Sequence, residues 1–157
     1  MLHRVCPHEV GHAEVATYFG ARVHGIALTH KNDGLEAVAL YETRIDMPLK
    51  DRCTIKAAGP AGEVIAFGRY GALGASVDRQ HVREIGYFGD FDLLVQRATS
   101  ILQTRRTRFD RFASLLKQKI YESDEVRTME QLSPERLSLA RQLPLRVSGQ
   151  VGRARDD

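Results

Sequence analysis

Apolar and polar residues alternate along this chain with a helical period near both ends and with a strand-like period between them. The first pattern predicts a helix over about residues 7–19, and Pro7 suits its first position because proline has no N–H to leave unpaired. Residues 22–29 and 35–43 are β-rich, and the turn sequence Lys31-Asn32-Asp33-Gly34 lies between them. The N-terminal part is therefore expected to be a helix followed by a hairpin or small antiparallel sheet.

The middle of the chain returns to helical spacing. A second helix is expected over about residues 48–68, with a kink at Gly59-Pro60, because proline has no N–H to donate to a helical hydrogen bond. The glycine-containing loop 68–75 should separate it from a third helix over about residues 76–87, which Ser76 can cap.

The last long pattern runs from about residue 90 to residue 121, as one long helix or an interrupted one. A short helix should begin at Ser133-Pro134, and residues 144–157 are Arg-, Gly- and Asp-rich without periodicity. The expected fold is mainly α with a small β-hairpin or sheet. It would form one domain over residues 1–143, followed by a disordered basic tail.

Composition narrows the class of protein. The chain has 157 residues, 43% of them hydrophobic and 27% charged, which is ordinary for one folded domain. No apolar run approaches the ~18–20 residues of a membrane helix, and the N-terminus has no apolar signal-peptide core, so no membrane segment and a cytoplasmic location are expected. Cys6 and Cys53 match no zinc-knuckle or C-x-x-C spacing and are expected to be reduced thiols, with Cys6 a poor ligand candidate.

A net charge of +3 is mild, although arginines and lysines gather on the polar face of the 90–121 pattern. Such a run is usually a solvated face, and neither aromatic stacking platform nor nucleic-acid motif accompanies it. A nucleic-acid partner is therefore not expected.

Candidate chemistry lies in the first predicted helix, where His8-Glu9-Val10-Gly11-His12 reads H-E-x-x-H. His8 and His12 are four residues apart, so both imidazoles share one helix face and can reach one metal ion. Neutral imidazole suits zinc, and a catalytic zinc site has three protein ligands and one position for water. Glu9 would project beside the metal and act as general base. The motif leaves the third ligand open, and the plainer alternative is two polar histidines on a half-buried helix.

Three stretches together resemble the peptidase domain of FtsH-type membrane AAA proteases. Residues 8–13 (H-E-V-G-H-A) resemble that family's H-E-A-G-H-A helix, and residues 58–68 (A-G-P-A-G-E-V-I-A-F-G) are similar to its G-G-R-x-A-E-E-x-x-F-G helix. Residues 74–78 (G-A-S-V-D) are similar to its T-G-A-S-N-D loop and helix start. Residues 129–133 resemble the C-terminal turn more weakly, so the likeness covers about residues 7–140.

The resemblance implies an FtsH-like zinc peptidase domain with one Zn²⁺ per chain, in which Asp78 is the third metal ligand. Without it, Asp78 would only complement the dipole of the helix that it begins. Glu63 is the competing carboxylate, and two alternatives stay open for it: a partner that orients a ligand histidine, or a helix-surface residue. The implied function is a zinc metalloendopeptidase that hydrolyses peptide bonds with a metal-activated water, with Glu9 as its base.

The chain also departs from that family. It has no G-x-x-x-x-G-K-[ST] phosphate loop, no room for an ATPase domain and no membrane anchor, so the resemblance implies a stand-alone peptidase. Pro60 and Gly62 replace other residues of the family and could shift Glu63. Expected partners are a polypeptide substrate lying along the extended segment 35–43, and a separate unfoldase or further copies of the chain. The alternative is a zinc-binding regulatory or interaction module with little or no proteolytic activity.

Overall fold

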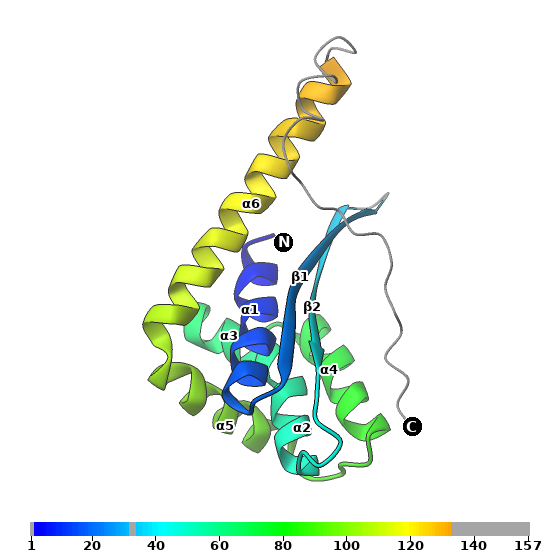
Figure 1. The fold of residues 1–157 in the computed structure, drawn as a ribbon, viewed down its shortest axis with the longest axis vertical. Coiled ribbons are helices and arrows are strands. Elements are labelled where there is room, and N and C mark those ends of the chain that lie inside the picture. The colour runs from blue at the N-terminus through cyan, green and yellow to red at the C-terminus, as the bar shows by residue number, and fades with distance from the viewer. Residues whose placement is uncertain (1, 32–33, 133–157) are drawn as a thin grey trace.

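The structure is a computed structural model that describes residues 2–31 and 34–132 (Figure 1). Within this part of the chain, six helices accompany one two-stranded hairpin, which confirms the mainly α fold with a hairpin near the N-terminus. The elements are α1 (Leu2–Tyr18), β1 (Arg22–Lys31), β2 (Gly34–Glu42), α2 (Leu49–Lys56), α3 (Ala58–Phe67), α4 (Ala72–Glu84), α5 (Phe91–Thr104) and α6 (Arg106–Leu132). The predicted helix at Ser133 and the predicted tail lie outside the described residues.

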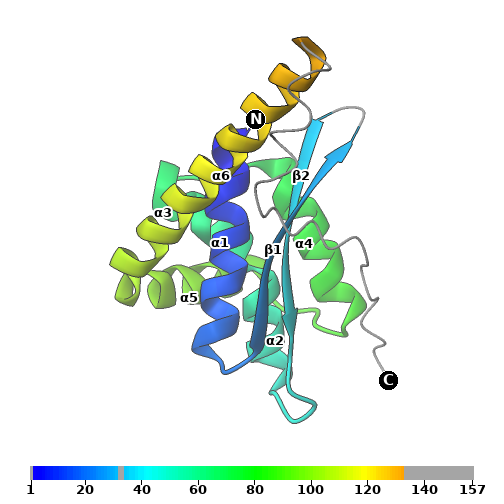
Figure 2. The same ribbon diagram turned by 45° about the horizontal axis from the view of Figure 1, so that its top comes forward.

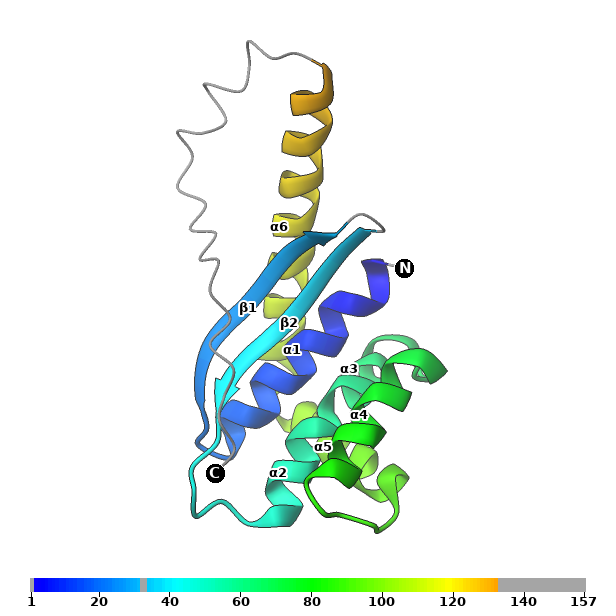
Figure 3. The same cartoon turned by 90° about the vertical axis from the view of Figure 1, so that its right-hand side faces the viewer.

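The hairpin runs alongside α1, as Figure 3 shows. β1 and β2 pair antiparallel, with Ile26 opposite Ala39, and a bulge interrupts the register between Val23 and Gly25. Successive side chains of a strand point to opposite faces, and here Ala37 is buried while Val38 is exposed. The predicted hairpin is confirmed, although its turn at residues 32–33 is not described.

Helix α1 begins about one and a half turns before the predicted start at Pro7. Pro7 lies inside the helix and loses one backbone hydrogen bond, but the added turns bury Cys6 against the core. The C-terminal end is as expected, since Gly20 has a φ of 77° and the chain turns back with a 2.9 Å bond from Ala21 N to Ala16 O.

The predicted single helix over 48–68 is wrong. The structure has two helices, α2 and α3, separated at Ala57 and not at Gly59-Pro60. Pro60 is the third residue of α3, where a missing N–H leaves no bond unmade. In a continuous helix the backbone nitrogen of Pro60 would have to donate a hydrogen bond to the carbonyl of Lys56. Proline has no N–H, so the helix ends before that point.

Helix α4 begins at Ala72, four residues before the predicted start, so Ser76 does not cap it. Asp78 therefore lies in the second turn, and the first turn contains no acidic residue. The reading of Asp78 as a first-turn dipole partner is thus wrong. The long C-terminal pattern is interrupted at Arg105 and forms α5 and α6.

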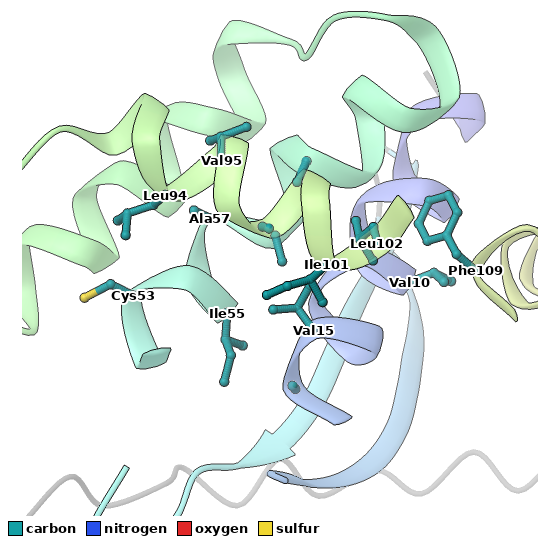
Figure 4. Packing of buried hydrophobic residues seen from close by; sticks show 14 of the residues in the cluster. Val10, Val15, Cys53, Ile55, Ala57, Leu94, Val95, Ile101, Leu102 and Phe109 are labelled. Carbon is teal, nitrogen blue, oxygen red and sulfur yellow. The ribbon is translucent and has the colours of Figure 1, made fainter. Parts of the chain in front are cut away.

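Helix α1 lies at the centre of the packing and contacts the hairpin, α2, α3, α5 and α6. Figure 2 shows α6 crossing α1 and extending beyond the other helices. The buried carboxylate of Glu14 ties the two together, since it accepts bonds from Arg105 Nε at 3.0 Å and Arg108 Nε at 2.8 Å. None of the described helices is long and apolar enough to cross a membrane. The core contributed by these helices includes Val10, Val15, Ile55, Leu94, Ile101, Leu102 and Phe109 (Figure 4).

The crossing of α1 and α3 is unusually close. A Cβ atom on Gly11 would lie 2.2 Å from the carbonyl oxygen of Ala58, and one on Gly62 would lie 2.0 Å from that of Pro7. Both distances are below any real Cβ contact, so only glycine fits on either side. Gly62 is therefore a requirement of this helix contact.

We expect Gly62→Ala to lower the free energy of unfolding by about 2 kcal/mol or more, because the added methyl group must push two backbones apart. A loss of stability would be specific evidence for the close contact, because replacing glycine by alanine inside a helix normally stabilises a protein by roughly 0.5–1 kcal/mol. Urea unfolding followed by circular dichroism measures the change. Gly71→Ala is the matched control, because its nearest contact would be an ordinary 3.4 Å. Equal stability of Gly62→Ala and wild type would contradict the described crossing.

Candidate metal centre

Three of the predicted site residues converge between α1 and α4. His8 and His12 lie on one face of α1, with ring centroids 5.0 Å apart and planes at 72°. Asp78 approaches from α4, with Oδ2 at 3.2 Å from His8 Nε2 and Oδ1 at 3.5 Å from His12 Nε2. The candidate ligand atoms all lie within 4.8 Å of one another, and His12 and Asp78 are buried. These three residues could hold a metal ion.

Two observations favour a metal ion between these three side chains. Asp78 Oδ2 is the one buried side-chain polar atom of the described residues that lacks a hydrogen bond, although His8 Nε2 is close by. Buried polar atoms are rarely left unpaired. The N–O distances of 3.2 and 3.5 Å also bracket the separation of about 3.3 Å between ligand atoms of a tetrahedral zinc site.

The remaining ring nitrogens set the tautomers of both histidines. His12 Nδ1 lies 2.8 Å from the carbonyl oxygen of Ile55, which can only accept, so this nitrogen carries the proton. His8 Nδ1 lies 2.9 Å from Glu63 Oε1 and donates in the same way. A neutral imidazole protonated at Nδ1 has its lone pair at Nε2. In that neutral form each Nε2 atom offers its lone pair to a metal ion.

Glu63 is buried and joins α1, α3 and the start of α4. Its Oε2 accepts bonds from Arg4 Nη1 at 2.9 Å and from Gly71 N at 2.8 Å, while Oε1 faces His8. The alternative of a helix-surface glutamate is therefore wrong. Pro60 and Gly62 do not move this carboxylate away from His8, because they lie in the same helix turn and let α3 approach α1.

The charges of the group are strongly coupled. Burial alone would lower the pKa of His8, but the nearby carboxylates of Asp78 and Glu63 outweigh it and raise the pKa to about 10. Burial would raise the pKa of Asp78, whereas the nearby imidazoles of His12 and His8 hold it far below the usual range. A metal ion must displace the proton that His8 holds in the apoprotein, so metal affinity should rise with pH.

Glu9 lies outside the converging group, as the motif predicts. Its Oε2 accepts a 2.8 Å hydrogen bond from the backbone N–H of Ala39 on β2. This bond fixes one oxygen of the carboxylate against the hairpin and leaves the other oxygen available. Whether Glu9 acts as a base stays a prediction.

Gly59 shapes the site in a way that its sequence context did not reveal. A Cβ atom on Gly59 would lie 2.3 Å from His8 Nε2 and 2.5 Å from His12 Nε2. The missing side chain therefore leaves room for the two ligand nitrogens. The sequence pattern had assigned Gly59 only a kink.

Sequence reasoning also missed four partners of the site residues. The carbonyl of Ile55 and the N–H groups of Ala39 and Gly71 belong to the backbone and leave no sequence signal. Arg4 does leave one, because it precedes His8 by four residues and so shares its helix face.

No protein-family model matches the chain, and a search of curated proteins finds no match to it. The likeness to FtsH-type peptidases therefore stays a prediction from the sequence motifs.

We expect Gly59→Ala to lose most of its metal, because the new methyl group would occupy the space beside both Nε2 atoms. Metal content per chain, measured by elemental analysis after purification without chelator, tests this. Gly71→Ala carries the same substitution beside Glu63 without a close contact and should keep its metal. Wild-type metal content in Gly59→Ala would contradict the assigned site.

Asp78→Asn and Glu63→Gln separate a ligand from an orienting partner, since each removes one negative charge and keeps its shape. Loss of the orienting carboxylate should weaken metal binding by about 10 to 100-fold, and loss of a ligand should weaken it further. Competition with a chromophoric chelator ranks the two variants. If Glu63→Gln binds metal more weakly than Asp78→Asn, the ligand assignment is wrong.

Proposed function

We propose that the protein is a zinc-dependent metalloendopeptidase that resembles the proteolytic domain of FtsH-type proteases. The observation that carries the proposal is the convergence of His8 Nε2, His12 Nε2 and the Asp78 carboxylate. Glu9 follows His8 on α1, and its carboxylate is hydrogen-bonded to Ala39 N on β2.

The donor set favours zinc among the common metals. Two imidazole nitrogens with one carboxylate oxygen suit zinc, whereas calcium and magnesium prefer oxygen ligands throughout. Three protein ligands also leave a fourth position for water or substrate, which distinguishes a catalytic zinc site from a closed structural one. The proposed ligand set is therefore that of a hydrolytic centre.

Peptide hydrolysis needs an electrophile and a base in the same place. A zinc ion bound by His8, His12 and Asp78 would polarise a peptide carbonyl and make water a better nucleophile. Glu9 accepts the proton that water loses as it adds to the carbonyl carbon. Its bond to Ala39 N holds the carboxylate in one orientation, and Glu9 then delivers the proton to the nitrogen of the leaving amine.

Strand β2 offers a place for an extended substrate. Ala39 directs its N–H to Glu9 and not to β1, so one edge of β2 faces the proposed base. Within the described residues β2 pairs with β1 alone, which leaves that edge for main-chain hydrogen bonds to another chain. This geometry favours unstructured polypeptides as substrates, as expected for segment 35–43. A folded substrate would first need a separate unfoldase.

A zinc-binding regulatory or interaction module is the competing function. The bond between Glu9 and Ala39 ties α1 to β2, and a module without catalysis would also benefit from that contact. A structural site, however, has no use for a carboxylate oxygen left available beside the metal. The two functions differ in what the loss of basicity at Glu9 changes.

We expect Glu9→Gln to keep its zinc and its melting temperature, because glutamine still accepts the bond from Ala39. Cleavage of an unfolded protein should fall by about 10² to 10⁴-fold, since the amide is too weak a base. Casein incubated without ATP, with fragments followed by mass spectrometry, measures this, and a chelator-treated sample is the control.

Equal cleavage by wild type and Glu9→Gln would mean a contaminant or another base and would remove the mechanism. If zinc-loaded wild type does not cleave casein, capture of partners from cell extract separates a regulatory module from a peptidase that needs an unfoldase.

A further inference from the structure

Tyr41 lies on β2 two residues beyond Ala39, whose N–H binds the proposed base. Residues two apart on a strand point to the same face, so Tyr41 shares the face of Ala37 and Ala39 that is turned towards α1. Val23 is its partner on β1, beside the bulge, and Lys56 Nζ lies 5.4 Å from the centre of its ring. The ring is therefore held from two sides in the neighbourhood of Glu9.

The hydroxyl group of Tyr41 has an unusual environment. Burial raises its pKa, and the negative charges of Asp78 and Glu9 raise it further, so the hydroxyl stays neutral. The described part of the chain provides no hydrogen bond to this hydroxyl. The hydroxyl oxygen is not among the fully buried side-chain atoms that lack a hydrogen bond. On the strand that binds Glu9, a neutral O–H group is thus left without a hydrogen-bond partner among the described residues.

We propose that the Tyr41 hydroxyl donates a hydrogen bond to the carbonyl oxygen of the peptide bond that is cleaved. This inference rests on the proposed peptidase function and names a further group that contacts the substrate. As water adds to the carbonyl carbon, the π electrons of the C=O bond move to that oxygen, and the hydrogen bond from Tyr41 strengthens. The proton stays on Tyr41, while Glu9 carries the proton of the water to the leaving nitrogen.

A donor that acts in this way stabilises the transition state more than the bound substrate. Its loss should therefore lower kcat and leave KM nearly unchanged. Loss of one such donor typically costs about 10² to 10³-fold in kcat. A tyrosine that only fills space would show neither effect when phenylalanine replaces it, because the ring is retained.

The test compares Tyr41→Phe with wild type in zinc content, melting temperature, casein-peptide kinetics and calorimetric binding of a phosphinic peptide. The tetrahedral phosphinate resembles the reacting centre, so its affinity reports on the donor without catalysis. Tyr121→Phe is the matched control, because Tyr121 is exposed on α6 and carries Lys117 Nζ at 5.9 Å from its ring centre.

The expected result is unchanged zinc and stability in Tyr41→Phe, with kcat and phosphinic-peptide affinity both reduced about 10²-fold. Unchanged kcat and affinity, or a loss of zinc or stability that accounts for the defect, would overturn the role of Tyr41. If zinc-loaded wild type neither cleaves peptides nor binds the phosphinic peptide, the peptidase function itself fails, and the role of Tyr41 fails with it.

Discussion

The candidate metal centre depends on two helices that touch backbone to backbone. At Gly11 and Gly62 no side chain separates α1 from α3, and a single added carbon atom on either residue would overlap a carbonyl oxygen of the other helix. The same closeness places Gly59 directly against the two ligand imidazoles and brings Glu63 within hydrogen-bond distance of His8. Helix packing and ligand geometry are therefore one constraint, which explains why glycines recur in both motifs.

The sequence predicted the types of the elements better than their boundaries, because tertiary contacts decide where helices begin. Helix α1 starts early because its first turns bury Cys6. Helix α4 begins four residues before Ser76, and the N–H of Gly71, just before the helix, donates to the carboxylate of Glu63. The break at Ala57 follows from Pro60, because proline has no N–H for a helical hydrogen bond. The sequence predicts a kink at Pro60 itself, whereas the helix ends before it. These helix boundaries therefore depend on more than the residues at the predicted ends.

The candidate site also contains residues that the sequence reveals and partners that it does not. Side chains with a recurring spacing, His8, Glu9 and His12, could be found from the sequence alone, and Asp78 followed from the resemblance of its motif. The groups that orient these side chains could not be found, because the carbonyl of Ile55 and the N–H of Ala39 belong to the backbone and do not depend on the residue type. These groups orient the site residues, since one sets the tautomer of His12 and the other binds the carboxylate of Glu9.

In the proposed function, zinc binds to two imidazole nitrogens and one carboxylate oxygen and not to sulfur, although Cys6 precedes His8 by only two residues on the same helix. X-ray absorption at the zinc edge of the purified, zinc-loaded protein tests this most directly. We expect four nitrogen or oxygen neighbours at about 2.0–2.2 Å, with outer scattering from two imidazole rings. A sulfur neighbour at about 2.3 Å, or scattering without imidazole, would contradict the proposed ligand set.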